Sequence, residues 1–174
     1  MDEFMPQKTL VIAPGKMAAF YSLHRLESEV FPFTGLFPSL RRHTPPLTPT
    51  QPDIFRSRQG TVPARLAELY QQLACEYYLV PAEPSARPTI PGLTLAGFTR
   101  WLTLATRAHP SEEARRLAKL VAALPINADS PLDGKPERLP KQLSRRLLPD
   151  KPDRQAHLLF TTTLKAHLLS LIHI

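Results

Sequence analysis

The segment that decides the fold is residues 63–81, PARLAELYQQLACEYYLVP. Its apolar residues recur at spacings of three and four, which places them on one face of a helix. They are Leu66, Leu69, Tyr70, Leu73, Ala74 and Tyr77. Pro63 suits the first helical position, where a missing N–H costs nothing, and Pro81 cannot continue a helix. The pattern predicts an amphipathic helix over residues 63–80.

Two further helices are predicted beyond the proline-rich loop at residues 81–88. Thr94 is a good N-cap for a helix over residues 94–108, and Ser111 for one that ends before Pro125. The apolar faces of the three helices should form one core. Its expected members are Leu66, Tyr70, Leu73, Phe98, Trp101, Leu117, Leu120 and Val121.

The rest of the chain is interpreted from its apolar spacing and its prolines. We expect a β-prone run at 9–12, a helix from Lys16, a packed aromatic loop at 31–37, a loop at 126–138, a short helix at 140–147 and a last helix at 153–168. The predicted fold class is all-α, a compact assembly of five or six short helices with Pro-rich connections. Residues 9–149 form a single helical domain with a Pro-rich loop at about 38–62, and 150–168 a C-terminal helix.

Composition restricts the class of protein. The chain has 174 residues, of which 20 are proline and 6 glycine, and a formal net charge of +7. The single cysteine excludes an internal disulfide framework and favours a reducing compartment. No apolar run is long enough for a membrane span. We expect an intracellular protein, cytoplasmic or nuclear, with affinity for anionic partners.

No catalytic, cofactor or metal site is predicted. No two histidines have the i, i+4 spacing of a helical zinc pair, and there is no Gly-rich phosphate loop. Cys75 is read as a helical residue whose burial keeps the thiol unreactive. The order of helix 63–80, a loop with Ile90 in a short strand, and helix 94–108 is that of a calcium-binding unit. Glu83 alone offers a carboxylate in that loop, so no ion is expected.

The basic region at residues 135–154 holds seven Lys or Arg residues against three acidic ones. Lys141, Arg145 and Arg146 are the candidate anion-contacting residues, with nucleic acid or anionic lipid as the partner. The alternative is a small amphipathic element docked on the core, because leucines alternate with the cations. These leucines are Leu139, Leu143, Leu147 and Leu148.

Short stretches along the chain resemble a family of fungal domains of unknown function, over residues about 9–149. They include Val11–Pro14 with Lys16-Met17, Cys75-Glu76, Ile90–Thr94, Gly97-Phe98, Arg100-Trp101, Ala108–Pro110, Glu137-Arg138, Pro140-Lys141 and Arg145–Leu147. The chain departs from the family at Tyr77-Tyr78, where histidines are expected, and at Leu139 and Leu148, where phenylalanines are expected. The resemblance implies an independent helical domain of a larger protein, with helical sequence before this start. It implies no activity and no catalytic residues.

Residues 169–174, LSLIHI, are expected to be foreign to the protein. CTG TCT CTT ATA CAC ATC encodes them, and this is the end of a common sequencing adapter; the alternative is the end of an amphipathic helix. The chain is then a fragment. Together these observations predict a non-enzymatic interaction or scaffolding domain of a larger intracellular fungal protein. The alternative function is electrostatic binding of nucleic acid or anionic lipid through residues 135–154.

Overall fold

The computed structural model describes residues 10–37, 62–82, 85–130, 133–138 and 140–172. Within these ranges, helices combine with two small antiparallel sheets, so the prediction of an all-α fold is wrong. The elements are α1 (Pro14–Leu23), α2 (Phe33–Leu36), α3 (Val62–Gln72), β1 (Tyr77–Val80), β2 (Ile90–Leu93), α4 (Leu95–Ala108), α5 (Pro110–Ala123), β3 (Asn127–Asp129), β4 (Pro136–Arg138), the 3-10 helix η2 (Arg145–Leu147) and α6 (Arg154–Ile172). The predicted Pro-rich loop lies outside the described residues, apart from its last residue.

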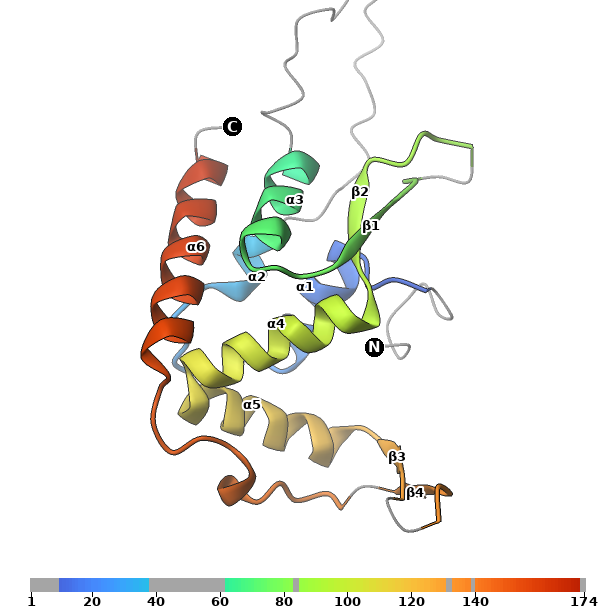
Figure 1. Ribbon diagram of the computed structural model, residues 1–174, viewed down its shortest axis with the longest axis vertical. Coiled ribbons are helices and arrows are strands. Elements are labelled where there is room, and N and C mark those ends of the chain that lie inside the picture. Colours follow the sequence, from blue (N-terminus) through green and yellow to red (C-terminus); the bar gives the residue numbers. More distant parts are fainter. Residues whose placement is uncertain (1–9, 38–61, 83–84, 131–132, 139, 173–174) are drawn as a thin grey trace, which may run out of the picture.

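Helix α4 crosses the middle of the molecule (Figure 1). Helices α3 and α6 pack against each other, and α6 also packs on α4, which has α5 along its other side. The β1–β2 hairpin and the chain from β3 to η2 lie at opposite ends of the view. No helix in the described ranges has both the length and the apolar character needed to cross a bilayer.

Helix α3 ends at Gln72, so the predicted helix is wrong beyond that residue. Ala74 has a φ of 53° and closes the helix in the left-handed conformation of a Schellman motif. Its N–H donates to the Gln71 carbonyl at 3.0 Å, and the Cys75 N–H donates to the Tyr70 carbonyl at 2.8 Å. The periodic pattern could not show this end, because alanine is the best helix former and glycine is usual at this position.

The residues after this turn form strand β1, which pairs antiparallel with β2. Tyr78 lies opposite Gly92, and Val80 opposite Ile90. Aromatic and β-branched residues favour strands, so the apolar end of the predicted helix is equally suited to a hairpin. The short strand expected at Ile90 is confirmed.

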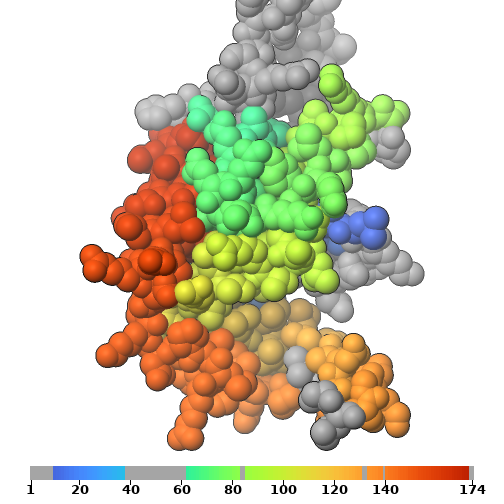
Figure 2. Space-filling model, viewed as in Figure 1, coloured from blue at the N-terminus to red at the C-terminus, as the bar shows by residue number. Residues whose placement is uncertain are grey.

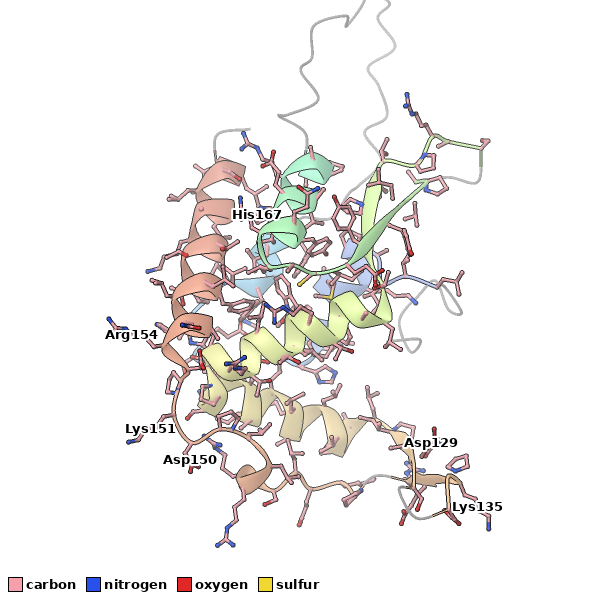
Figure 3. All side chains as sticks on the ribbon, viewed as in Figure 1. Asp129, Lys135, Asp150, Lys151, Arg154 and His167 are labelled. Carbon is pink, nitrogen blue, oxygen red and sulfur yellow. The ribbon has the colours of Figure 1, made fainter. Side chains whose placement is uncertain are left out.

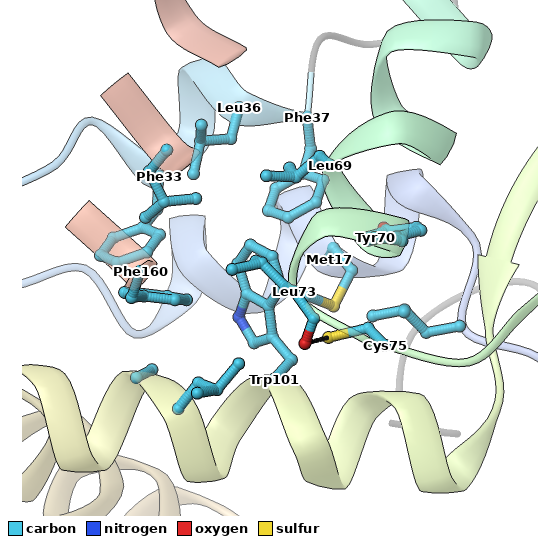
Figure 4. Close-up of a cluster of buried hydrophobic side chains, with 14 of the residues drawn as sticks. Met17, Phe33, Leu36, Phe37, Leu69, Tyr70, Leu73, Cys75, Trp101 and Phe160 are labelled. Carbon is cyan, nitrogen blue, oxygen red and sulfur yellow. Dashed lines mark hydrogen bonds between the residues drawn. The ribbon is translucent and has the colours of Figure 1, made fainter. Parts of the chain in front are cut away.

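The core surrounds Trp101, the only tryptophan of the chain, which is fully buried (Figure 4). Its Nε1 donates a hydrogen bond to the Tyr21 hydroxyl at 2.6 Å. The Phe160 ring of α6 meets it edge-on, with 5.4 Å between ring centroids, and Phe37 lies at 5.7 Å. Aromatic side chains from α1, from the end of α2 and from α6 therefore converge on α4.

The predicted core is confirmed for the first two helices and wrong for much of the third. Leu66, Tyr70, Leu73 and Trp101 are buried, Phe98 and Leu120 are partly buried against the core, and Leu117 and Val121 are half-buried outside it. The aromatic segment at 31–37 does pack on the core, but it contains helix α2. The buried side of α5 consists of Pro110, Glu113 and Arg116.

Of the two predicted N-caps, the one at the start of α4 is confirmed and the one at the start of α5 is wrong. The Thr94 hydroxyl accepts a hydrogen bond from the Gly97 N–H at 3.0 Å, as predicted for the start of α4. Helix α5 begins at Pro110 with His109 as its N-cap, so Ser111 lies inside the helix. Proline at the first position explains the earlier start, because it needs no hydrogen-bond acceptor there.

The C-terminal third contains a second hairpin, so the loop predicted at 126–138 is wrong where β3 pairs with β4. The short helix predicted at 140–147 is reduced to the single turn of η2. Helix α6 covers the predicted last helix, and the Asp153 carboxylate accepts from the Ala156 N–H at its start, at 2.8 Å. Phe160 and Leu164 bury their side chains in the core.

Candidate functional site

An apolar groove of about 560 Å³ lies beside the β1–β2 hairpin. Segments from three parts of the chain form it, and nearly all of their side chains are apolar. Its lining residues are Leu10, Val11, Ala13, Tyr78, Val80, Pro81, Ala82 and Ile90. The Tyr78 side chain is 61% exposed and Leu10 97%, so the groove carries accessible apolar surface.

The strand register explains how the groove forms. Side chains alternate between the two faces of a strand, so Tyr78 and Val80 share one face of the hairpin with Ile90 and Gly92. Gly92 has no side chain on that face, and Val11 occupies the space. A Cβ at Gly92 would lie 2.7 Å from Val11 Cγ2, closer than van der Waals contact allows. Glycine therefore lets the N-terminal segment form one wall of the groove.

Strand β2 has a backbone partner on both edges: β1 on one and Ile12 on the other. Its Leu93 exchanges two backbone hydrogen bonds with Ile12, at 2.7 and 3.0 Å. Pro91, two residues before, has no N–H, so it cannot donate the next hydrogen bond of that ladder. The β-prone run predicted at 9–12 thus joins the sheet through a single bridge.

Strand β1 has a free edge within the described part of the chain. The Thr94 N–H bonds the Glu76 carbonyl at 3.1 Å, which fixes the alternation of the antiparallel ladder. Glu76, Tyr78 and Val80 therefore face β2, whereas the N–H and C=O groups of Tyr77 and Leu79 point away from it. No backbone hydrogen bond joins those outward groups to another described residue.

The hairpin is fixed to α4 by contacts at its base. The Thr94 hydroxyl donates to the Glu76 carboxylate at 2.8 Å, in addition to capping α4. Gly97 in the first turn of α4 packs directly on the backbone of Glu76, so closely that a Cβ would overlap it. The groove and the free edge therefore belong to a hairpin with a rigid base.

A second cluster, of charged side chains, is largely buried and lies between α5 and the segment that follows α1. Arg116 is 0% exposed, and its guanidinium contacts Glu113 at 3.2 Å and Glu29 at 2.9 Å. The guanidinium also donates to the His24 carbonyl and lies over the Tyr21 ring, 4.8 Å from its centroid. Burial raises the pKa of the Glu113 carboxyl. These groups are enclosed, so we assign them to the attachment of α5.

The apolar pattern of the sequence did not predict this cluster, because it indicated that α5 contributes only its apolar residues Leu117, Leu120 and Val121 to the core. The only local signal is the i, i+3 spacing of Glu113 and Arg116, which is common on exposed helices too. The distant partner Glu29 has no sequence signal at all.

Among the described residues, the remaining reactive side chains come together at most as one pair of histidines. Among the described residues there is no group of three or more metal-ligating side chains. The rings of His109 and His157 lie 4.9 Å apart at the junction of α4, α5 and α6. Cys75 follows α3 instead of lying within a helix, and burial raises the pKa of its thiol to about 12. Glu83, the one carboxylate of the hairpin loop, lies outside the described residues.

The predicted anion-contacting residues lie far from the groove, on the chain that leads to and includes η2 (Figures 1 and 2). Lys141, Arg145 and Arg146 are all exposed. The Arg145 guanidinium donates to the Leu148 carbonyl at 3.1 Å and lies across its own turn. These three residues do not share a site with the hairpin.

Comparison with known proteins identifies a family for this chain, but no individual relative. No curated protein and no solved structure matches it. The profile of a domain of unknown function, DUF7514, matches residues 1–164, well beyond the resemblance read from the sequence. The match covers most of the chain and every element up to the middle of α6. The chain therefore belongs to the DUF7514 family.

Proposed function

We propose that this is a non-enzymatic interaction domain, part of a larger intracellular fungal protein, that binds an extended apolar segment of a protein partner at the β1–β2 hairpin. The observation that supports it is the free edge of β1 directly beside the apolar groove. A strand added to such an edge gains main-chain hydrogen bonds, and its alternate side chains gain apolar burial. The buried single cysteine is in keeping with a reducing compartment.

Two features of the hairpin determine which contacts an added strand would make. The outward groups of Tyr77 and Leu79 offer two N–H donors and two C=O acceptors. On the groove side, Tyr78 presents an exposed aromatic ring, a residue type enriched at protein interfaces. We expect a bound segment to place a large apolar side chain beside Tyr78 and to tolerate polar ones on the opposite face.

A displayed peptide library selected against the purified domain tests this function. We expect enriched peptides with apolar residues at every second position. Binding, measured by fluorescence anisotropy of the synthesised peptide, should weaken at least about tenfold in Tyr78→Ser, since an apolar contact is lost. Leu158→Ser is the matched control, because Leu158 is similarly exposed on α6 and lies outside the groove.

Two results would contradict the proposal. One is a library that yields no enriched sequence against the folded wild-type domain. The other is a set of peptides whose affinity for Tyr78→Ser equals that for Leu158→Ser.

A further inference from the structure

The end of the molecule opposite the hairpin is strongly basic. All seven Lys and Arg residues of the 135–154 region are exposed. Its acids are partly engaged elsewhere, since the Asp153 carboxylate pairs with Arg107 at 2.7 Å. In the described residues, none of Lys141, Arg145, Arg146 or Lys151 makes an ion pair with a carboxylate. Their charge is therefore available to an external anion.

The cations of the 135–154 region are spread across this end of the molecule. Figure 3 places Lys135, which pairs with Asp133 at 3.5 Å, on one side and Lys151, beside Asp150, on the other, with Arg154 higher along that side. Such an arrangement does not enclose a small anion, but it can meet an extended anionic surface at several points. The spacing therefore favours a surface as the partner over a single phosphate group.

An exposed leucine lies within the basic strip. Leu147 in η2 is 73% exposed, directly after Arg145 and Arg146. Leu147 and the half-buried Leu148 both line a hollow with Leu117 of α5, so the turn rests on the helices. Leu147 thus keeps a large exposed apolar surface at the rim of this hollow, directly after two cations.

From this juxtaposition we infer that the η2 end of the domain docks on the surface of an anionic lipid bilayer. Leu147 enters the boundary between headgroups and acyl chains, while Lys141, Arg145, Arg146 and Lys151 contact lipid phosphates and carboxylates. Basic residues flanking an apolar side chain are the features that peripheral membrane contacts use. Nucleic acid fits less well, because residues 135–154 contain no aromatic side chain to stack on bases.

This surface is independent of the hairpin groove. A domain with lipid at one end and a protein segment at the other would hold that segment near a membrane. Failure of either proposal leaves the other intact, because the two tests use different residues and different probes.

Co-sedimentation with lipid vesicles tests the inference. The full chain is mixed with phosphatidylcholine vesicles, with or without about 30% phosphatidylserine, at physiological salt. We expect binding only to the phosphatidylserine vesicles, and a steep loss of binding in high salt. Arg145→Ala with Arg146→Ala should lower the partition coefficient roughly 30-fold, since each cation near the surface contributes about fivefold.

A charge-matched control separates this surface from net charge. Arg87→Ala with Lys165→Ala removes two exposed cations, one in the β1–β2 loop and one on α6, and should leave binding nearly unchanged. Leu147→Ser should lower binding about tenfold without any change of charge. All these positions are exposed, so far-ultraviolet circular dichroism should report a native fold in each variant.

The inference is overturned if neutral vesicles bind equally well, if neither kind of vesicle binds, or if the control pair loses as much binding as the Arg145 and Arg146 pair. It is also overturned if a single-stranded oligonucleotide binds at the same salt while phosphatidylserine vesicles do not. That result would assign the strip to nucleic acid.

Discussion

Replacing Arg116 should destabilise the protein more than replacing any exposed residue. Its guanidinium is completely buried, bonded to Glu113 and Glu29, and lies over the Tyr21 and Phe33 rings. Removing one partner of a buried ion pair leaves uncompensated charge and costs about 3–5 kcal/mol. The two cation–π contacts act in the same direction. We expect Arg116→Met to lose about 4 kcal/mol of unfolding free energy.

A second substitution separates the penalty of the unpaired carboxylates from the other effects of losing Arg116. Methionine keeps much of the side-chain volume, so the main penalty in Arg116→Met is the unpaired carboxylates. Adding Glu113→Gln neutralises one of them and should restore about 1–2 kcal/mol. Urea unfolding followed by Trp101 fluorescence and circular dichroism measures both values, since Trp101 lies in the core. A loss below about 1 kcal/mol, or a double variant as unstable as the sum of the singles, would refute the reasoning.

Three further substitutions test local features by the same urea assay. Gly97→Ala should lose roughly 3 kcal/mol or fail to fold, because its Cβ overlaps the Glu76 backbone; wild-type stability would contradict that packing. Ala74→Gly should gain about 1 kcal/mol, because glycine adopts the left-handed turn without strain, and a loss would argue against the turn. Burial, then the neighbouring His157, lowers the pKa of His109. The neutral imidazole is therefore favoured on folding, and its contribution to stability is present above about pH 6.5 and lost as the pH falls. His109→Gln should accordingly lose less stability than the wild type between about pH 7 and pH 5, and equal losses would count against this assignment.

The helices that carry a continuous apolar face were predictable from local pattern. Thr94 and the stripe through Trp101 identify α4, and the leucines after Pro63 identify α3. In each case the cap or proline and the spacing point to the same structure. Such elements can be predicted from sequence because independent local signals agree.

The features that were missed depend on contacts between distant residues or on backbone conformation. The left-handed Ala74 turns the chain into β1 although no glycine marks the position. Burial of Arg116 requires Glu29, which is 87 residues away in sequence. The groove likewise combines Val11 with Tyr78, and only the folded sheet brings them together.

Amide hydrogen exchange at strand β1 tests the proposed partner segment most directly. In the free domain the outward N–H groups of Tyr77 and Leu79 should exchange rapidly, whereas those of Tyr78 and Val80 are already bonded to β2. A saturating amount of a selected peptide should slow exchange at Tyr77 and Leu79 by about tenfold or more and change the other two little. Unchanged exchange at Tyr77 and Leu79, in a sample where the peptide is bound, would contradict strand addition at this edge.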